Sequence, residues 1–306
     1  MYTILCIMTC RHFLKKNELI TNVLGLREHK LRSNPLVSVE LTELRKKGIA
    51  AMITHLRLKA YGKINLALDV LGRRDNGYHD VRMIMQTVGL HDRIELYRTK
   101  EPGIRLETNL FYLPNNEQNL AYRAAALLME EFGVKEGVSI KLKKFIPVSA
   151  GMAGGSTDAA AALYGMNQMF DLGLNMEQLK ERGVKIGADV PYCLMRGTAL
   201  AEGIGEKLTR LPRVPHCYVL VGKPGVNVST KTAYENLKLD DPAVVHPDID
   251  GMVTAVRNGD LDGMISRMGN VFEPGIISKY PVIQEIKDLM ESNGARKAMM
   301  SGSGPT

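Results

Sequence analysis

The sequence contains no tryptophan, only four cysteines, and no apolar run near the roughly 18 residues that a membrane span requires. An integral membrane protein is therefore not expected. The cysteines lack the paired spacing of a zinc site, so we expect reduced thiols in a cytoplasmic chain. They are Cys6, Cys10, Cys193 and Cys217. With 306 residues, 45% of them hydrophobic, the chain is long enough for one large domain or two ordinary ones.

A strongly basic body is also missing, although the whole chain carries a net charge of +7. Residues 1–51 hold nine basic and four acidic residues, which leaves 31 basic and 29 acidic residues for the remaining chain. That remainder is close to neutral. It has no basic stripe with interleaved aromatic residues, so no nucleic-acid partner is expected.

Residues 1–51 keep neither a helical nor a strand period for long, and they lack the pattern of a secretory signal. An organellar transit peptide is the alternative, but such peptides normally avoid acidic residues. The segment ends in RKKGIAAM, and Lys-Lys-Gly codons can spell a ribosome-binding sequence shortly before Met52. We therefore predict that residues 1–51 are a disordered or non-native extension and that the folded protein begins at Met52.

Regular secondary structure is predicted after this segment. Strands are expected over 55–72, 86–99, 138–147 and 217–225, and helices over 120–133, 156–170 and 176–187. Asn119 and Asn175 are suitable N-caps, and Gln178 would complete a capping box with Asn175. Residues 187–212 predict a short turn and extended segments. Two or three helices are expected after the last strand, and a domain boundary is expected near residues 210–214.

One glycine-rich stretch, FIPVSAGMAGGSTDAAAALYGMNQ at residues 145–168, has the composition of a phosphate-binding loop. A P-loop is excluded, because Ser156 follows Gly155 where that motif needs lysine, and the next lysine is Lys180. A dinucleotide-binding fingerprint is excluded because the glycine spacing differs from G-x-G-x-x-G.

The remaining design uses only the loop and the start of the following helix. Gly151, Gly154 and Gly155 let the backbone approach an anion, and the free N–H groups of a helix that begins at Ser156 would donate to it. The hydroxyls of Ser156 and Thr157 would contact a phosphate or a bound Mg²⁺. The alternative is a glycine turn that caps a buried alanine-rich helix, and the loop by itself does not decide between the two.

Three segments, in order, resemble the motifs of the GHMP small-molecule kinases, which include galactose, homoserine and mevalonate kinases. They are LKAYGKINLALDVLGRRDNGYHDV, PVSAGMAGGSTDAAAAL and MMSGSGPT, and the resemblance covers residues 54–306. Met152 and Ala153 replace the family's usual leucine and glycine. The resemblance implies a two-domain α+β fold with the site in the cleft between the domains. The ATP-binding domain at 52–211 would be like domain 2 of ribosomal protein S5, with a left-handed βαβ crossover, and 212–306 would be ferredoxin-like.

Relatives of this kind continue through a strand and a helix after GSGPT, whereas this sequence stops at Thr306. We therefore expect the carboxy-terminal domain to be truncated and incomplete. A chain that ends there is expected to have weak activity and poor stability.

The segments KINL, DNGYH, GADVP and SGSGPT are together similar to one branch of this family. That branch phosphorylates the 2-hydroxyl of a cytidylyl methylerythritol diphosphate in the non-mevalonate isoprenoid pathway. The resemblance implies a cytoplasmic kinase that uses ATP and Mg²⁺, acts on a small molecule, has no membrane partner, and is compatible with a homodimer. Another GHMP kinase of the homoserine or mevalonate type is one alternative, and a non-catalytic ligand sensor with this fold is the other.

The resemblance also assigns roles to residues. Asp189 would accept the proton of the substrate hydroxyl, and Lys63 would orient that group and stabilise the developing charge. Tyr78 and Tyr234 would stack on the cytosine, and His79 would hydrogen-bond its edge. ATP is expected to contact Pro147, Ala150, Gly151, Met152, Ala153, Gly154, Gly155, Ser156, Thr157 and Asn119, and the acceptor substrate to contact Asn65, Tyr78, His79, Thr230 and Tyr234. No dedicated cage of metal ligands is visible.

Several of these residues also have an ordinary structural interpretation. Lys63 alone reads as a surface lysine, Asp189 as a helix N-cap, Asn65 as a turn residue and Tyr234 as an aromatic of a buried helix face. The Gly-Tyr-His signature argues against the other GHMP kinases, and the presence of Lys63 and Asp189 argues against a sensor without turnover.

Overall fold

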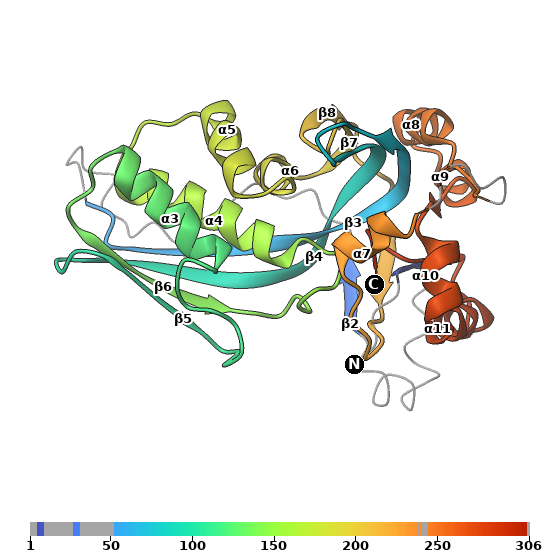
Figure 1. The fold of residues 1–306 in the computed structure, drawn as a ribbon, viewed down its shortest axis with the longest axis horizontal. Helices are drawn as coiled ribbons and strands as arrows, with labels where there is room; N and C mark the ends of the chain where they lie inside the picture. Colours follow the sequence, from blue (N-terminus) through green and yellow to red (C-terminus); the bar gives the residue numbers. More distant parts are fainter. Residues whose placement is uncertain (1–4, 9–26, 31–51, 238, 240–243, 305–306) are drawn as a thin grey trace.

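The computed structural model describes residues 5–8, 27–30, 52–237, 239 and 244–304. These residues form an elongated molecule with two halves (Figure 1). A seven-stranded sheet with helices on one face makes up the larger half, and a four-stranded sheet with several short helices makes up the smaller half.

The larger half is built around a sheet with the strand order β10-β3-β4-β6-β5, in which β7 also pairs with β4 and with β8. Its strands are β3 (His55–Arg73), β4 (His79–Thr99), β5 (Ile104–Thr108), β6 (Gly137–Lys143), β7 (Thr198–Glu202), β8 (Lys207–Leu211) and β10 (Gly269–Asn270). Its helices are α3 (Leu120–Glu131), α4 (Gly154–Met169), α5 (Met176–Ile186) and α6 (Val190–Met195). Strand β10 comes from late in the chain and pairs parallel with β3, which joins the two halves.

The smaller half has a sheet with the strand order β11-β1-β9-β2. Its strands are β1 (Leu5–Met8), β2 (Arg27–Lys30), β9 (Tyr218–Val221) and β11 (Lys297–Met299). Its helices are α7 (Thr230–Glu235), α8 (Ile249–Asn258), α9 (Leu261–Ser266), α10 (Glu273–Lys279) and α11 (Val282–Ser292). Strands β1 and β2 lie within the predicted extension at residues 1–51. The rest of that segment and residues 305–306 lie outside the described residues.

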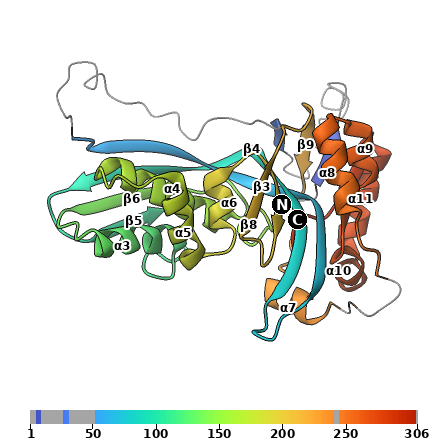
Figure 2. The same ribbon diagram turned by 90° about the horizontal axis from the view of Figure 1, so that it is seen from above.

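Strands β3 and β4 form a long antiparallel hairpin that curves from one half of the molecule to the other (Figure 2). The register of the pair shifts between Tyr61 and Lys63 and again between Asn65 and Ala67. Such bulges bend a strand and re-aim its side chains. Residues 62–70 are all buried, so this part of the hairpin is covered on both faces. The bulged segment thus carries Lys63 and Asn65 into the interior between the two halves.

Helix α4 packs closely on this hairpin because small residues form much of its surface. Ala159, Ala162 and Leu163 are fully buried. A Cβ atom at Gly165 would lie only 2.3 Å from Leu96 Cδ1, so any larger residue there would force the helix away from the sheet. The start of α4, and with it the glycine-rich loop, is therefore held at a fixed place beside β3 and β4.

The expected helix caps are confirmed. The Asn119 side chain accepts a hydrogen bond from the Ala121 N–H, and Asn175 and Gln178 form the complete capping box. Two other expectations were wrong. Residues 190–195 form helix α6 instead of an extended segment, and five helices, rather than two or three, follow β9 among the described residues. Three of those five have only six or seven residues, which is too short to display an apolar period.

Candidate active site

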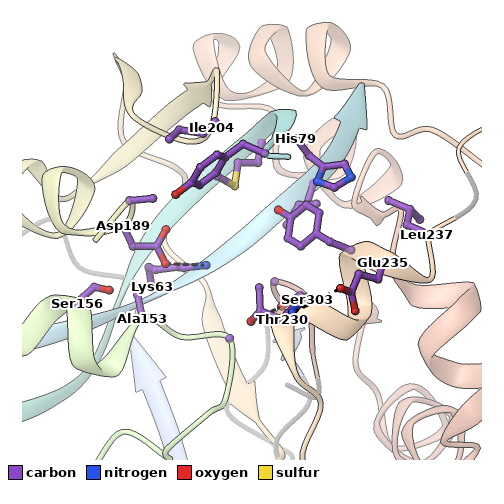
Figure 3. A pocket seen from close by; sticks show the side chains of 18 of the residues that line it. Lys63, His79, Ala153, Ser156, Asp189, Ile204, Thr230, Glu235, Leu237 and Ser303 are labelled. Carbon is purple, nitrogen blue, oxygen red and sulfur yellow. Dashed lines mark hydrogen bonds and ion pairs between the residues drawn. The ribbon is translucent and has the colours of Figure 1, made fainter. Parts of the chain in front are cut away.

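A cavity of about 1450 Å³ lies between the two halves of the molecule. It receives side chains from the β3–β4 hairpin, the glycine-rich loop, the start of α6, helix α7 and the glycine turn near residue 302. Figure 3 shows Lys63, Asp189 and Ser156 on one side and His79, Glu235 and Leu237 on the other. Twelve of the described residues predicted to form the site line this cavity: Lys63, Tyr78, His79, Ala150, Gly151, Ala153, Gly154, Gly155, Ser156, Asp189, Thr230 and Tyr234.

Lys63 and Asp189 point toward one another in the cavity (Figure 3), with Lys63 Nζ 4.0 Å from Asp189 Oδ2. The Lys63 side chain is 7% exposed and that of Asp189 is 33% exposed, so the lysine lies beneath the carboxylate. Asp189 occupies the N-cap position of α6, but its side chain makes no capping hydrogen bond. The carboxylate is therefore left to face the cavity and the ammonium group.

Asn65 fixes Lys63 from below rather than lining the cavity. Its Oδ1 accepts a hydrogen bond of 2.8 Å from Lys63 Nζ, and its own side chain is fully buried. The backbone N–H of Asn65 donates to Ser301 Oγ at 3.0 Å, and the side-chain Nδ2 of Asn65 lies 3.1 Å from Met83 Sδ. The predicted contact of Asn65 with the acceptor substrate stays a prediction, and its position in the structure is that of a support for the lysine.

The glycine-rich loop ends in helix α4, which begins at Gly154, two residues before the predicted start at Ser156. The first hydrogen bond of the helix runs from the Thr157 N–H to the Ala153 carbonyl at 2.8 Å. The N–H groups of Gly154, Gly155 and Ser156 precede that bond and have no partner within the helix. All three residues line the cavity, so the positive end of the helix faces it.

A close approach of backbone to backbone connects this loop to the glycine turn of the carboxy-terminal motif. Gly151 has φ +65°, and a Cβ atom there would lie 2.4 Å from the Ser301 carbonyl oxygen. The Lys63 N–H donates to the Met152 carbonyl at 3.1 Å. Strand β3, the glycine-rich loop and the carboxy-terminal motif thus form one connected wall of the cavity.

Four described residues predicted to contact ATP do not line the cavity: Pro147, Met152, Thr157 and Asn119. Met152 is 1% exposed, and the Thr157 hydroxyl donates to the Tyr61 carbonyl at 2.8 Å. Asn119 uses both ends of its amide within its own turn, capping α3 and donating to the Pro114 carbonyl. Of the two hydroxyl residues predicted to contact phosphate, Ser156 and Thr157, Ser156 is the one that lines the cavity.

Among the aromatic side chains predicted for base binding, His79 lies across the cavity from Lys63 (Figure 3). The His79 and Tyr234 rings contact each other with centroids 4.9 Å apart, and Tyr234 also packs edge-on against Phe272. Tyr78 is separate from this pair and 59% exposed. Burial, with the nearby charge of Arg73, lowers the pKa of His79, which favours a neutral imidazole. Ser303 Oγ donates to Thr230 Oγ1 at 3.0 Å on the floor of the cavity (Figure 3).

Several residues of the cavity wall were not predicted from the sequence. Arg73, Lys231 and Glu235 are charged, and Ile204 and Leu237 are apolar. Lys231 and Glu235 directly follow the predicted residues Thr230 and Tyr234, and Arg73 and Leu237 lie within five residues of predicted ones, which is a signal that could have found them. Ile204 carries no such signal, because its place in the wall depends on how distant segments pack.

The first testable prediction concerns Ala153, a residue with a side chain in left-handed backbone geometry (φ +55°, ψ 34°). Ala153→Gly removes a backbone strain of about 1 kcal/mol, although the more flexible unfolded chain offsets part of this gain. We expect a melting temperature higher by about 2 °C in thermal unfolding. Ala126→Gly in the middle of α3 is the control, with an expected loss of about 1 kcal/mol. A lower melting temperature for Ala153→Gly would contradict the prediction.

The described residues contain no helix both long and apolar enough to cross a lipid bilayer. They also contain no cluster of three histidine, cysteine or carboxylate side chains arranged to hold a metal ion. Cys193 and Cys217 are both buried free thiols.

Comparison with known proteins was made by sequence and by structure. The family model described as "GHMP kinases N terminal domain" matches residues 119–197, and that described as "GHMP kinases C terminal" matches residues 252–306. A protein of Lachnospira eligens named 4-diphosphocytidyl-2-C-methyl-D-erythritol kinase is 60% identical over 252 residues, covering 82% of this chain and 87% of its own. A protein of the same name from Lachnoclostridium phytofermentans is 57% identical, covering 82% and 86%.

Among solved structures, that of a 4-(cytidine 5'-diphospho)-2C-methyl-D-erythritol kinase superposes with a TM-score of 0.68 at 30% identity. The match covers 81% of this chain and 87% of that one. Homoserine kinase from Cytophaga hutchinsonii superposes with a TM-score of 0.63 at 20% identity, covering 84% and 85%, and shows a shared fold. The two-domain α+β fold expected from the sequence motifs is thereby confirmed.

Proposed function

Because the chain belongs to the GHMP kinases, and within them to the 4-diphosphocytidyl-2-C-methyl-D-erythritol kinases, we propose that it phosphorylates the 2-hydroxyl of that cytidylyl substrate with ATP. This is a step of the non-mevalonate isoprenoid pathway, and we assign it to the cytoplasm. The observation that carries the assignment of the chemistry is the Lys63–Asp189 pair, 4.0 Å apart in a cavity whose wall also contains the glycine-rich loop.

The proposed reaction is a single displacement. The substrate oxygen forms a bond to the γ-phosphorus of ATP while the bond from that phosphorus to the bridging oxygen of ADP breaks. Asp189 takes the proton that the hydroxyl loses, and Lys63 stabilises negative charge on the reacting oxygens. The hydrogen bond from Lys63 to Asn65 supports this assignment, because it holds the ammonium group in one place before substrate arrives.

The glycine-rich loop is proposed to bind the ATP phosphates. The N–H groups of Gly154, Gly155 and Ser156 belong to the first turn of α4 and to residues that line the cavity, and the left-handed Gly151 leaves room for backbone alone. Mg²⁺ fits this wall, because the Ser156 hydroxyl and the Asp189 carboxylate are oxygen groups of the kind that it prefers. When bound, the ion would neutralise part of the phosphate charge.

The cytidylyl end is assigned to the opposite wall. Tyr78 offers an exposed ring for stacking, the His79–Tyr234 pair offers a second aromatic surface, and His79 offers a neutral ring nitrogen for the base edge. Thr230 is placed to donate or accept a hydrogen bond beside Ser303. The volume of the cavity, about 1450 Å³, leaves room for a nucleotide-bearing acceptor substrate beside ATP.

The assay that tests this function compares three acceptors: the cytidylyl methylerythritol substrate, homoserine and mevalonate. ATP consumption with the cytidylyl substrate alone, and a product phosphorylated at the 2-position by ³¹P NMR, is the expected result. Phosphorylation of homoserine or mevalonate instead would assign the chain to another GHMP activity. Binding of ATP and substrate without product would make it a sensor.

A second testable prediction follows from the exposed ring of Tyr78. Tyr78→Ala should weaken binding of the cytidylyl substrate by about 5- to 150-fold, because stacking of a base on an aromatic ring contributes roughly 1–3 kcal/mol. The Michaelis constants of both substrates measure this, and that of ATP should stay unchanged. Tyr112→Ala is a matched control, since Tyr112 is 60% exposed, against 59% for Tyr78, and does not line the cavity. An equal loss for ATP would count against the stacking role.

A further inference from the structure

A buried cluster of three charged side chains joins the two ends of the glycine-rich loop. Lys144 immediately precedes the loop, Asp158 lies in the first turns of α4 after it, and Asp92 belongs to β4. Lys144 Nζ is 2.5 Å from Asp92 Oδ2 and 2.5 Å from Asp158 Oδ2. The three side chains are 5%, 0% and 3% exposed, respectively. One ammonium group thus connects both ends of the loop to the central hairpin.

The backbone at the start of the loop is fixed by the same cluster. The second oxygen of Asp92 accepts hydrogen bonds from the N–H groups of Phe145, at 2.5 Å, and Ile146, at 2.8 Å. The Asn109 side chain accepts from the Lys144 N–H at 2.7 Å and donates to the Lys144 carbonyl at 3.2 Å. A change in the cluster would therefore shift loop backbone directly.

The ammonium group also lies directly behind the phosphate-facing end of α4. A Cβ atom at Gly154 would be 3.2 Å from Lys144 Nζ, so the ammonium group lies directly against the backbone of Gly154. Gly154 also lines the cavity. The Lys144 side chain therefore fills the space beside Gly154 and limits how far the start of α4 can move.

The charges of the cluster fit this position. Burial opposes the charge on Lys144, but the two carboxylates outweigh burial and raise its pKa, so the lysine stays protonated. Burial raises the pKa of Asp158 well above its usual range, and Asp158 Oδ1 has no hydrogen-bond partner. Because one ammonium group is held between two carboxyl groups, the contribution of the cluster to the loop is positional.

We propose that Lys144, held by Asp92 and Asp158, is a positioning residue for ATP: it fixes the spacing of the two ends of the glycine-rich loop and the place of Gly154 at the start of α4. This inference rests on the proposed function only in that the loop must bind ATP phosphates.

The test measures equilibrium binding of a non-hydrolysable ATP analogue and of the cytidylyl substrate to the full chain. Lys144→Met should weaken binding of the ATP analogue about tenfold or more, since a displaced loop would lose hydrogen bonds from its N–H groups to charged phosphate oxygens. Binding of the cytidylyl substrate should change less than twofold, which a general loss of structure would not allow. Asp158→Asn keeps an oxygen for the ammonium group and should show a smaller loss in the same direction.

Arg98→Met is the control. Arg98 pairs with Glu136 and donates to the Met169 carbonyl at the far end of α4, so its loss perturbs the same helix without touching the loop. It should lower the melting temperature while leaving both affinities unchanged. If Lys144→Met does not fold, ATP binding by Asp158→Asn tests the proposal instead, and circular dichroism checks that this variant is folded.

Unchanged ATP affinity in a folded Lys144→Met or Asp158→Asn variant would overturn the proposal, and so would equal weakening of both ligands. Because the ATP analogue binds without turnover, the result does not depend on which acceptor the wild-type enzyme phosphorylates. Failure of the wild-type protein to phosphorylate the cytidylyl substrate would overturn the proposed function alone.

Discussion

Asp189→Asn is expected to lower kcat by about 10²- to 10⁴-fold while the affinity for ATP stays within about twofold of wild type, because general base catalysis contributes effects of that size. Asparagine preserves the volume of the side chain but cannot accept the proton of the substrate hydroxyl. The Asp189 carboxylate makes no capping hydrogen bond to α6, so the substitution should leave the helix intact. Steady-state kinetics with both substrates measures the split between kcat and KM.

The control for this prediction is Glu181→Gln, which removes one exposed carboxylate from α5 outside the cavity. It should leave kcat unchanged. The double variant Lys63→Met/Asp189→Asn adds a further check, since residues that act as one unit give non-additive losses. A double variant scarcely slower than Asp189→Asn would support a joint role, whereas unchanged turnover in Asp189→Asn would remove this residue from the chemistry.

Gly151→Ala is expected to cost about 2–4 kcal/mol of unfolding free energy and most of the ATP affinity. Left-handed backbone geometry at φ +65° costs an alanine about 1–2 kcal/mol, and the contact of its Cβ with the Ser301 carbonyl, at 2.4 Å, adds a packing cost of about 1–3 kcal/mol. The loop must move away from the carboxy-terminal motif to relieve that contact. Urea unfolding and binding of an ATP analogue measure the two losses.

Gly173→Ala separates strain from contact in this prediction. Gly173 has φ +72°, but nothing lies within 4 Å of its would-be Cβ, so this variant should lose only the conformational cost of about 1–2 kcal/mol and keep its affinity for ATP. If the two variants had equal stability and equal ATP affinity, the close approach at Gly151 would contribute nothing to the unfolding free energy or to ATP binding.

Features set by a few neighbouring residues could be predicted from the sequence. Asn119 and the Asn175–Gln178 capping box depend on hydrogen bonds within one turn, and both are present. The start of α4 could not be predicted in the same way. Ala153 is a residue that disfavours the left-handed geometry it adopts, and its place is set by packing of the loop against β3 and the carboxy-terminal motif.

The same contrast between features set by neighbouring residues and features set by distant ones applies to the site. Lys63 and Asp189 were identified because each lies in a short motif, and the structure brings them to 4.0 Å. Lys144 was missed, although it directly precedes the glycine-rich stretch, because its partners Asp92 and Asp158 are 52 and 14 residues away. No local spacing rule connects an ammonium group with two carboxylates at such separations.

The hydrogen bond between Asn65 and Ser301 joins residues 236 positions apart in the chain. Contacts of such long range form late in folding, because closing a large loop costs conformational entropy before the contacts can contribute stability. The β3–β4 hairpin has to close only its own short turn. During synthesis, the hairpin and the glycine-rich loop therefore emerge without the wall that completes the cavity. The cavity is therefore complete only once residues 301–303 have joined its wall, and the β3–β4 hairpin and the glycine-rich loop cannot form it by themselves.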